Sequence, residues 1–220
     1  MPIVIENMQE KKYENIDILY SLGSWEEYMI SNFETELKKS PIKTQQKLTV
    51  SPEEMDFRTT IQKLKESNSD AIYMVLADFG AAGEFFKQKE QLGLEKEVYV
   101  WSGFENYEML ENYGKYLESA IYPIAKENQN EQEFNKKYAK RYGTEPTTPS
   151  AGTSYDAVKM LAIAIENDEN VMKGLNEIKG YSGASTIHSF TANGLANSNK
   201  EYKLKTVREG EFVETNNSIK

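Results

Sequence analysis

Short apolar runs alternate with amphipathic stretches through the first 125 residues. Ile16 to Tyr20 and Ala71 to Leu76 are nearly continuous apolar runs, typical of strands buried on both faces of a parallel sheet. Residues 25–39 and 52–66 instead carry apolar side chains near helical spacing. This alternation predicts an α/β fold in which helices cover a parallel sheet.

Two start signals predict where the first helices begin. Ser24 and Glu27 have the spacing of a capping box ahead of a helix over about residues 25–39. The string Ser-Pro-Glu-Glu at 51–54 repeats the signal with proline at the first helical position. We therefore expect the second helix to begin at residue 52.

The pattern changes at Glu127. Residues 127–179 predict three helices with no strand between them, and β signals return after Gly180. The later strands are expected at 186–190, 202–207 and 212–213, with turns at Asn193-Gly194 and Glu209-Gly210.

The amino-acid composition argues against several classes of function. Lys and Arg number 26 against 35 Asp and Glu, so the net charge of −9 repels nucleic acid and anionic membranes. The absence of cysteine excludes thiol nucleophiles, disulfides and cysteine-ligated metals. Residues 1–12 show no signal peptide, and no apolar run is long enough to cross a bilayer.

Several short strings agree in order and spacing with one known family. They are Asp70-Ala71-Ile72-Tyr73, Gln91-Leu92-Gly93-Leu94, Tyr142-Gly143 with Pro146, Tyr155-Asp156-Ala157-Val158, and Ile178-Lys179-Gly180-Tyr181-Ser182-Gly183. Together they resemble the C-terminal part of a type I periplasmic-binding-fold solute receptor, of the leucine/isoleucine/valine-binding class of ABC transporters.

The resemblance implies a three-layer αβα fold with a mostly parallel central sheet, plus a helical segment. Residues 1–126 and 180–220 would form lobe 2, and residues 127–179 the helices that normally pack on lobe 1. Most of lobe 1 would be missing, with Met1 the start of a truncated gene or of an expressed fragment. Helices within 150–178 would then expose apolar faces, which predicts either self-association or refolding of these helices against lobe 2.

The implied function is the ligand-binding component of an ABC transporter for amino acids, branched-chain or related. Such a receptor is an extracytoplasmic lipoprotein that partners a permease, performs no catalysis and needs no cofactor or metal. With half of its site absent, this chain is expected to bind amino acids weakly or not at all.

Ligands of open α/β sheets bind at the carboxyl ends of the strands, which nominates three loops. The resemblance places Trp25 at an aromatic position that touches ligand, although a surface aromatic is the alternative. After the most apolar strand, Ala77, Asp78 and Phe79 offer a carboxylate for a ligand ammonium and a ring for its side chain. Asp78 is equally suited to cap the following helix.

The third loop contains Phe104 and Glu105. The resemblance places the amine-binding acid of the family in this loop, at one of these two positions, which favours Glu105.

Two other functions stay open. One is an intracellular or signalling ligand-sensing module of the same fold, and the other a small α/β enzyme with Asp78 and Glu105 as acid and base. The single histidine, His188, has no nearby acid in the sequence and is interpreted as a structural or exposed residue, not as a base or ligand.

Overall fold

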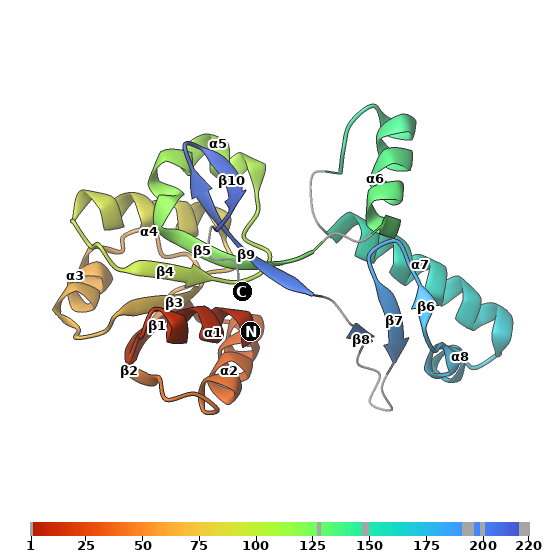
Figure 1. The fold of residues 1–220 in the computed structure, drawn as a ribbon, viewed down its shortest axis with the longest axis horizontal. Helices are drawn as coiled ribbons and strands as arrows, with labels where there is room; N and C mark the ends of the chain where they lie inside the picture. Colours follow the sequence, from red (N-terminus) through yellow and green to blue (C-terminus); the bar gives the residue numbers. More distant parts are fainter. Residues whose placement is uncertain (1, 127–128, 147–149, 191–195, 199–200, 216–220) are drawn as a thin grey trace. The chain divides into compact units, whose positions relative to one another are not determined.

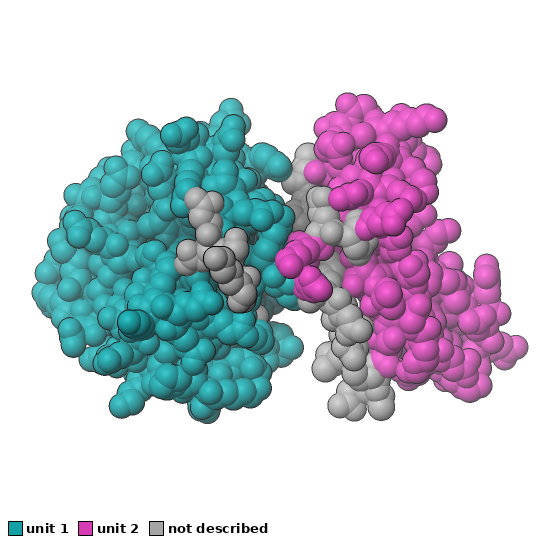
Figure 2. Space-filling model, viewed as in Figure 1, with its two compact units in different colours: residues 1–124, 202–220 teal, residues 125–201 magenta. Residues whose placement is uncertain are grey.

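The computed structural model describes residues 2–126, 129–146, 150–190, 196–198 and 201–215 (Figure 1). The chain forms two compact units (Figure 2), unit 1 with residues 1–124 and 202–220, and unit 2 with residues 125–201. Residues 180–201, which the sequence analysis grouped with residues 1–126, fall in unit 2. The assignment of chain segments to receptor lobes stays a prediction.

Unit 1 is built on a seven-stranded sheet with the order β10-β9-β5-β4-β3-β1-β2. Its strands are β1 (Asn15–Ser21), β2 (Lys43–Val50), β3 (Ala71–Val75), β4 (Glu97–Val100), β5 (Ala120–Ala125), β9 (Tyr202–Arg208) and β10 (Glu211–Glu214). β2, β1, β3, β4 and β5 pair in parallel, and β9 and β10 form an antiparallel hairpin. The predicted mostly parallel sheet is confirmed.

Helices cover both faces of this sheet (Figure 1). One face carries α1 (Pro2–Glu10) and α2 (Ser24–Leu37), and the other carries α3 (Arg58–Glu66), α4 (Phe79–Gln91), α5 (Tyr107–Tyr113) and the 3-10 helix η1 (Gly114–Ser119). Successive strand residues alternate between the two cores, as β pleating requires. Ile72 and Met74 face α3 and α4, whereas Tyr73 faces α2 and stacks on Phe33 with ring centroids 3.7 Å apart. The three-layer αβα architecture is confirmed.

The predicted capping box at Ser24 does not form. The N-cap of α2 is Gly23, so Ser24 is already the first helical residue and its hydroxyl cannot cap the helix. The Glu27 amide donates to the Gly23 carbonyl at 2.9 Å. The neighbouring Glu26, which was not part of the predicted box, is buried and accepts a hydrogen bond from Ser21 Oγ at 2.9 Å.

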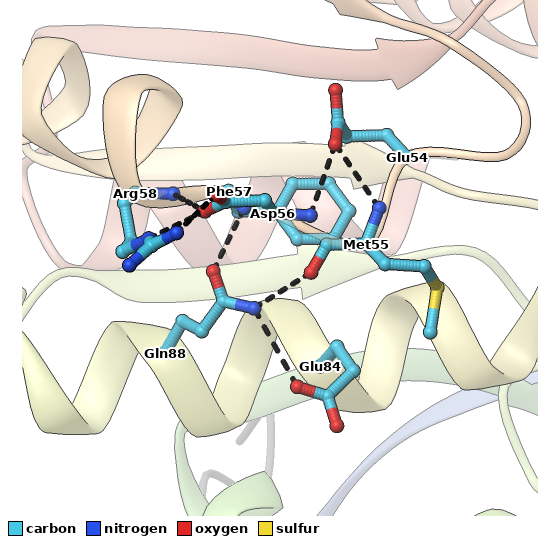
Figure 3. Close-up of polar contacts among 7 residues, drawn as sticks. All are labelled: Glu54, Met55, Asp56, Phe57, Arg58, Glu84 and Gln88. Carbon is cyan, nitrogen blue, oxygen red and sulfur yellow. Dashed lines mark hydrogen bonds and ion pairs between the residues drawn. The ribbon is translucent and has the colours of Figure 1, made fainter.

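The second start signal also fails, because residues 51–57 form a loop with a turn at 52–53, and α3 begins only at Arg58 (Figure 3). Glu54 Oε1 accepts from the backbone amides of Met55 and Asp56 at 3.1 and 2.9 Å. These short-range bonds give the backbone donors partners outside a helix.

Gln88 of α4 holds this loop in place (Figure 3). Its Oε1 accepts from the Phe57 amide at 2.8 Å, and its Nε2 donates to the Met55 carbonyl at 2.8 Å. A single side-chain amide thus satisfies the amide at the N-cap of α3 and fixes the loop against α4.

Unit 2 contains three helices and a small antiparallel sheet. The helices are α6 (Gln129–Tyr142), α7 (Ser150–Asn167) and α8 (Val171–Glu177), and the sheet is β6 (Tyr181–Ser182), β7 (Ile187–Phe190) and β8 (Ala196–Ser198). The three predicted helices are confirmed. The strand predicted at 186–190 forms β7, but it pairs within this small sheet and not with the sheet of unit 1. The predicted turn at Asn193-Gly194 lies outside the described residues.

We predict that Gln88→Ala lowers the free energy of unfolding by about 1–3 kcal/mol, because it leaves the Phe57 amide and Met55 carbonyl without their partner. The matched control is Gln62→Ala, whose amide donates only to exposed Glu66 on the same helix; it should cost less than about 0.5 kcal/mol. Urea unfolding of both variants measures the difference. Equal losses would show that Gln88 does not hold the loop.

Candidate functional site

The carboxyl ends of β1, β3 and β4 meet at one edge of the sheet. These strands are parallel neighbours, so the loops that follow them emerge side by side. The three loops begin at Leu22, Leu76 and Trp101. The candidate residues from the sequence lie either in these loops or in the first turn of α2 and α4, the helices that follow two of them. Unit 1 therefore brings the predicted loops together.

Three rings at this edge form what we call the aromatic cluster: Trp25 at the start of α2, Phe79 at the start of α4, and Trp101 in the loop after β4. Trp101 lies between the other two, with Trp25 edge-on at 5.0 Å between centroids and Phe79 stacked at 5.9 Å. Trp101 Nε1 donates to the Leu76 carbonyl at 3.3 Å, which fixes the indole across the end of β3. Trp25 is 41% exposed, so the cluster presents aromatic surface to solvent.

A glycine makes room for the central indole. A Cβ atom at Gly103 would come within 1.7 Å of the Trp101 ring, closer than any real contact. The loop after β4 therefore needs glycine at 103 for Trp101 to lie over it.

Asp78 and Ala77 lie exposed beside the cluster. Asp78 Oδ1 accepts from the Ala81 amide at 2.7 Å, so the expected helix cap is confirmed. This bond also fixes the direction of an exposed carboxylate next to Phe79. A role in ligand binding stays a prediction.

Phe104 lies in the core and not at the surface. It is 1% exposed, with its ring 5.8 Å from Phe86 and 5.6 Å from Tyr122. The turn that joins the Trp101 carbonyl to the Phe104 amide at 3.3 Å precedes a side chain packed inward. We therefore leave Phe104 out of the candidate site.

Glu105 already has partners within unit 1. Its Oε1 accepts from Tyr122 Oη at 2.9 Å and forms an ion pair with Lys205. Burial, followed by the neighbouring carboxylate, raises the pKa of Tyr122, so its phenol stays a hydrogen-bond donor. A ligand ammonium at Glu105 would have to compete with Lys205.

A sequence profile of the family described as periplasmic binding protein matches residues 4–207. The chain belongs to the periplasmic binding protein family. This is a family of binding proteins. No curated protein sequence matches the chain.

Solved structures of periplasmic binding proteins share its fold. A leucine-binding protein of Thermotoga maritima is 19% identical, with a TM-score of 0.83 over 97% of this chain and 63% of its own. The LivJ substrate-binding protein of Streptococcus pneumoniae, solved with isoleucine, is 20% identical, with a TM-score of 0.78 over 96% and 62%. A solute-binding protein from R. palustris, solved with benzoate, is 14% identical, with a TM-score of 0.78 over 97% and 61%.

The chain thus spans less than two-thirds of the length of these solved relatives. At such identities the likeness establishes the fold.

Trp101 is the residue of this periplasmic binding protein that sequence reasoning missed. The sequence analysis did not nominate it, although it directly follows β4 at the carboxyl edge. The sequence did contain one signal for Trp101, namely a glycine two residues later. Gly103 has no side chain, so the Trp101 ring can lie over it.

His188 has an acid partner, which corrects the sequence expectation. His188 Nε2 lies 3.0 Å from Asp156 Oδ2, a residue 32 positions away on α7, and 3.2 Å from Ser185 Oγ. Asp156 also accepts from the amides of Ala184 and Ser185 at 2.6 and 2.7 Å. A Cβ at Gly183 would come within 2.4 Å of this carboxylate, so the 183–185 turn closes on it only with glycine.

This cluster is structural. Asp156, Ser185 and His188 are at most 5% exposed, and one histidine nitrogen faces both the acid and the serine, so the ring does not bridge the two. Within the described residues no group of three or more acidic or histidine side chains is placed to hold a metal, and no helix is long and apolar enough to cross a membrane.

Asp156 makes the stability of unit 2 dependent on pH. Burial, the largest effect, raises its pKa, but hydrogen bonds from the Ser185 side chain and backbone, His188 and the Ala184 amide outweigh it, and the net pKa lies below 3.8. A lowered carboxyl pKa contributes stability above the unfolded value. That contribution is lost as the pH falls through the folded value.

We predict that Asp156→Asn destabilises unit 2 by about 3 kcal/mol at neutral pH, since an amide cannot accept at both oxygens. The variant should also lose less stability than the wild type when the pH falls below 3.8. Unfolding followed by hydrogen exchange of α7 amides measures both effects. Glu177→Gln, at an exposed carboxylate of the same unit, serves as control, and an equal cost for the two substitutions would contradict the assignment.

Proposed function

We propose that unit 1 supplies one wall of an amino-acid receptor that serves an ABC transporter. The observation that supports this is the aromatic cluster at the carboxyl edge of the sheet, with the exposed carboxylate of Asp78 beside it. The ligand is a branched-chain amino acid or a related amide, the partner of the whole protein is a permease, and the place of action is extracytoplasmic.

The chemistry of this wall matches the two ends of such a ligand. Exposed ring surface takes an aliphatic side chain by apolar burial, and a carboxylate with a fixed direction takes the ammonium group. The leucine and isoleucine named for two solved relatives have this combination of groups. Asp78 is the better ammonium partner of the two predicted acids, because Glu105 is engaged by Lys205 and Tyr122.

One half of a two-lobed ligand site is expected to bind its ligand weakly. Receptors of two lobes gain affinity when both lobes contact the ligand, which couples binding to hinge closure. We therefore expect this chain to bind leucine with an affinity weaker than micromolar.

Ligand binding is measurable through intrinsic fluorescence, because the two tryptophans of the chain are both in the aromatic cluster. We predict a weak, saturable change with leucine, isoleucine and valine. Asp78→Asn keeps the helix cap and should weaken leucine binding about tenfold, while binding of 4-methylpentanoate, which lacks the ammonium, stays the same.

Two controls sharpen this test. Trp25→Ala should weaken both ligands, whereas Tyr28→Ala, at an exposed aromatic residue of the same helix, should affect neither. Micromolar affinity would contradict the expected weakness. An equal loss of both ligands in Asp78→Asn would contradict the role of its carboxylate.

We propose further that the outward face of α7 joins two copies of the chain. Val158, Leu161 and Ile165 lie on this face and are 69%, 45% and 58% exposed. Met160 and Ala164 of the same helix are buried on its inner face, so α7 is apolar on both sides. A helix that is apolar all round normally lies within a core.

We predict a concentration-dependent dimer in light scattering, abolished by Val158→Glu because a charge in an apolar contact is costly. Thr153→Glu introduces the same charge at another exposed position of α7 and should leave the dimer intact. A monomer at every concentration, or a dimer that survives Val158→Glu, would refute association through this face.

A further inference from the structure

A groove of about 670 Å³ lies within unit 2, between α6, α7 and the β6 segment. Its volume falls in the range of small-molecule sites, roughly 300–1,000 Å³. It is separate from the aromatic cluster, since every residue that lines it belongs to unit 2.

Aromatic rings form one side of the groove. Phe134, Tyr138 and Tyr142 recur every four residues on α6, and their centroids are 6.0 and 4.6 Å apart along the row. Tyr155 of α7 continues the row, 5.3 Å from Phe134. α6 buries none of its residues, so these rings are not taken up by the core of unit 2.

Cations form a second stripe next to the rings. Lys137 and Arg141 lie four residues apart on α6, and Lys159 lies on α7. Arg141 lies over the Tyr142 ring at 5.5 Å and Lys159 over the Tyr155 ring at 6.0 Å. Among the described residues none of the three forms an ion pair with a carboxylate.

The charge of this groove is opposite to that of the chain. Three cations and a single carboxylate, Glu133, line it, whereas the net charge of the chain is −9. Such a local excess of positive charge attracts anions.

The floor of the groove is fixed. Asn130 Nδ2 donates to Ser182 Oγ and to the Gly183 carbonyl, each at 2.9 Å, and so ties the start of α6 to the turn after β6. The same turn is held from the other side by Asp156, which accepts from the Ala184 amide. The groove is therefore formed before a ligand arrives.

We propose that this groove binds small aromatic carboxylates. The ring of the ligand stacks against the aromatic row, and its carboxylate pairs with Arg141 and Lys137, where guanidinium geometry suits bidentate binding. A purely apolar ligand would not use the cations, and a simple anion would not use the row of rings, so a ligand that carries both an aromatic ring and a carboxylate matches the groove best. The site stands independently of the amino-acid receptor proposed for unit 1.

Phenylacetate is the test ligand, and phenylacetamide is its neutral match. We expect calorimetry and amide chemical-shift mapping to show phenylacetate in unit 2, with phenylacetamide about tenfold weaker or more. Lys137→Gln with Arg141→Gln should weaken phenylacetate about tenfold or more. Lys136→Gln with Lys140→Gln makes the same change of charge on the same helix, at positions that do not line the groove, and should leave binding unchanged.

Tryptophan fluorescence separates this site from the one in unit 1. Phenylacetate in the groove should not alter it, whereas leucine should, because both tryptophans are in unit 1. Loss of phenylacetate binding in Trp25→Ala, equal affinity for phenylacetamide, equal weakening by the Lys137/Arg141 and Lys136/Lys140 double substitutions, or no phenylacetate binding at all would each overturn the proposal. A failure of leucine binding would leave it standing.

Discussion

Burial of the parallel sheet on both faces is the constraint on which the rest of unit 1 depends. Successive residues of β3 enter opposite cores, with Tyr73 stacked on Phe33 on one side and Met74 packed toward α4 on the other. All five residues of β3 are buried, so none is left to face a ligand. Contacts with a solute must therefore come from the loops at the strand ends, where Trp25, Phe79 and Trp101 meet.

Unit 2 is organised around a polar group. Its apolar core is small, with Met160, Ala164 and Ile178 at the centre. The buried carboxylate of Asp156 adds hydrogen bonds that hold the elements of this unit together. This one side chain joins α7 to the turn after β6 and to β7 through four hydrogen-bonding partners. The same turn forms the floor of the α6–α7 groove, so the rigidity of the groove depends on Asp156.

The sequence predicted most of the fold because the fold depends on long periodic signals. The apolar run at 71–76 and the helical spacing of 127–179 are repeated over many residues, and both elements form as expected. The two capping signals failed because each rests on a few residues that a neighbour can redirect. The first helix begins one residue early, so the Glu27 amide donates to the Gly23 carbonyl, and the 51–57 loop is held by Gln88, 31 residues beyond Phe57. A capping pattern of four residues contains no information about a partner so far away in the sequence.

The candidate site was likewise predicted in part: its position was predicted from the sequence, but the orientation of its side chains was not. The three loops were identified because they follow the carboxyl ends of predicted parallel strands. The direction of each side chain, in contrast, depends on packing. Phe104 turns into the core against Phe86, and Trp101 takes the exposed edge because Gly103 leaves space for it. His188 was separated from Asp156 by 32 residues, and no pattern in the sequence connects them.

The two predicted acids show why a structural role does not exclude a functional one. The cap made by Asp78 occupies Oδ1 and fixes the side chain while it remains exposed, so a ligand ammonium that binds there meets a carboxylate whose rotamer is already restricted. Glu105 is also fixed, but by Lys205, a cation that supplies the same interaction the ligand would offer. A ligand gains at Asp78 a contact that the protein lacks, and at Glu105 only one that it must first break. We therefore propose that the helix cap Asp78, and not the more buried Glu105, is the carboxylate that a ligand ammonium would meet.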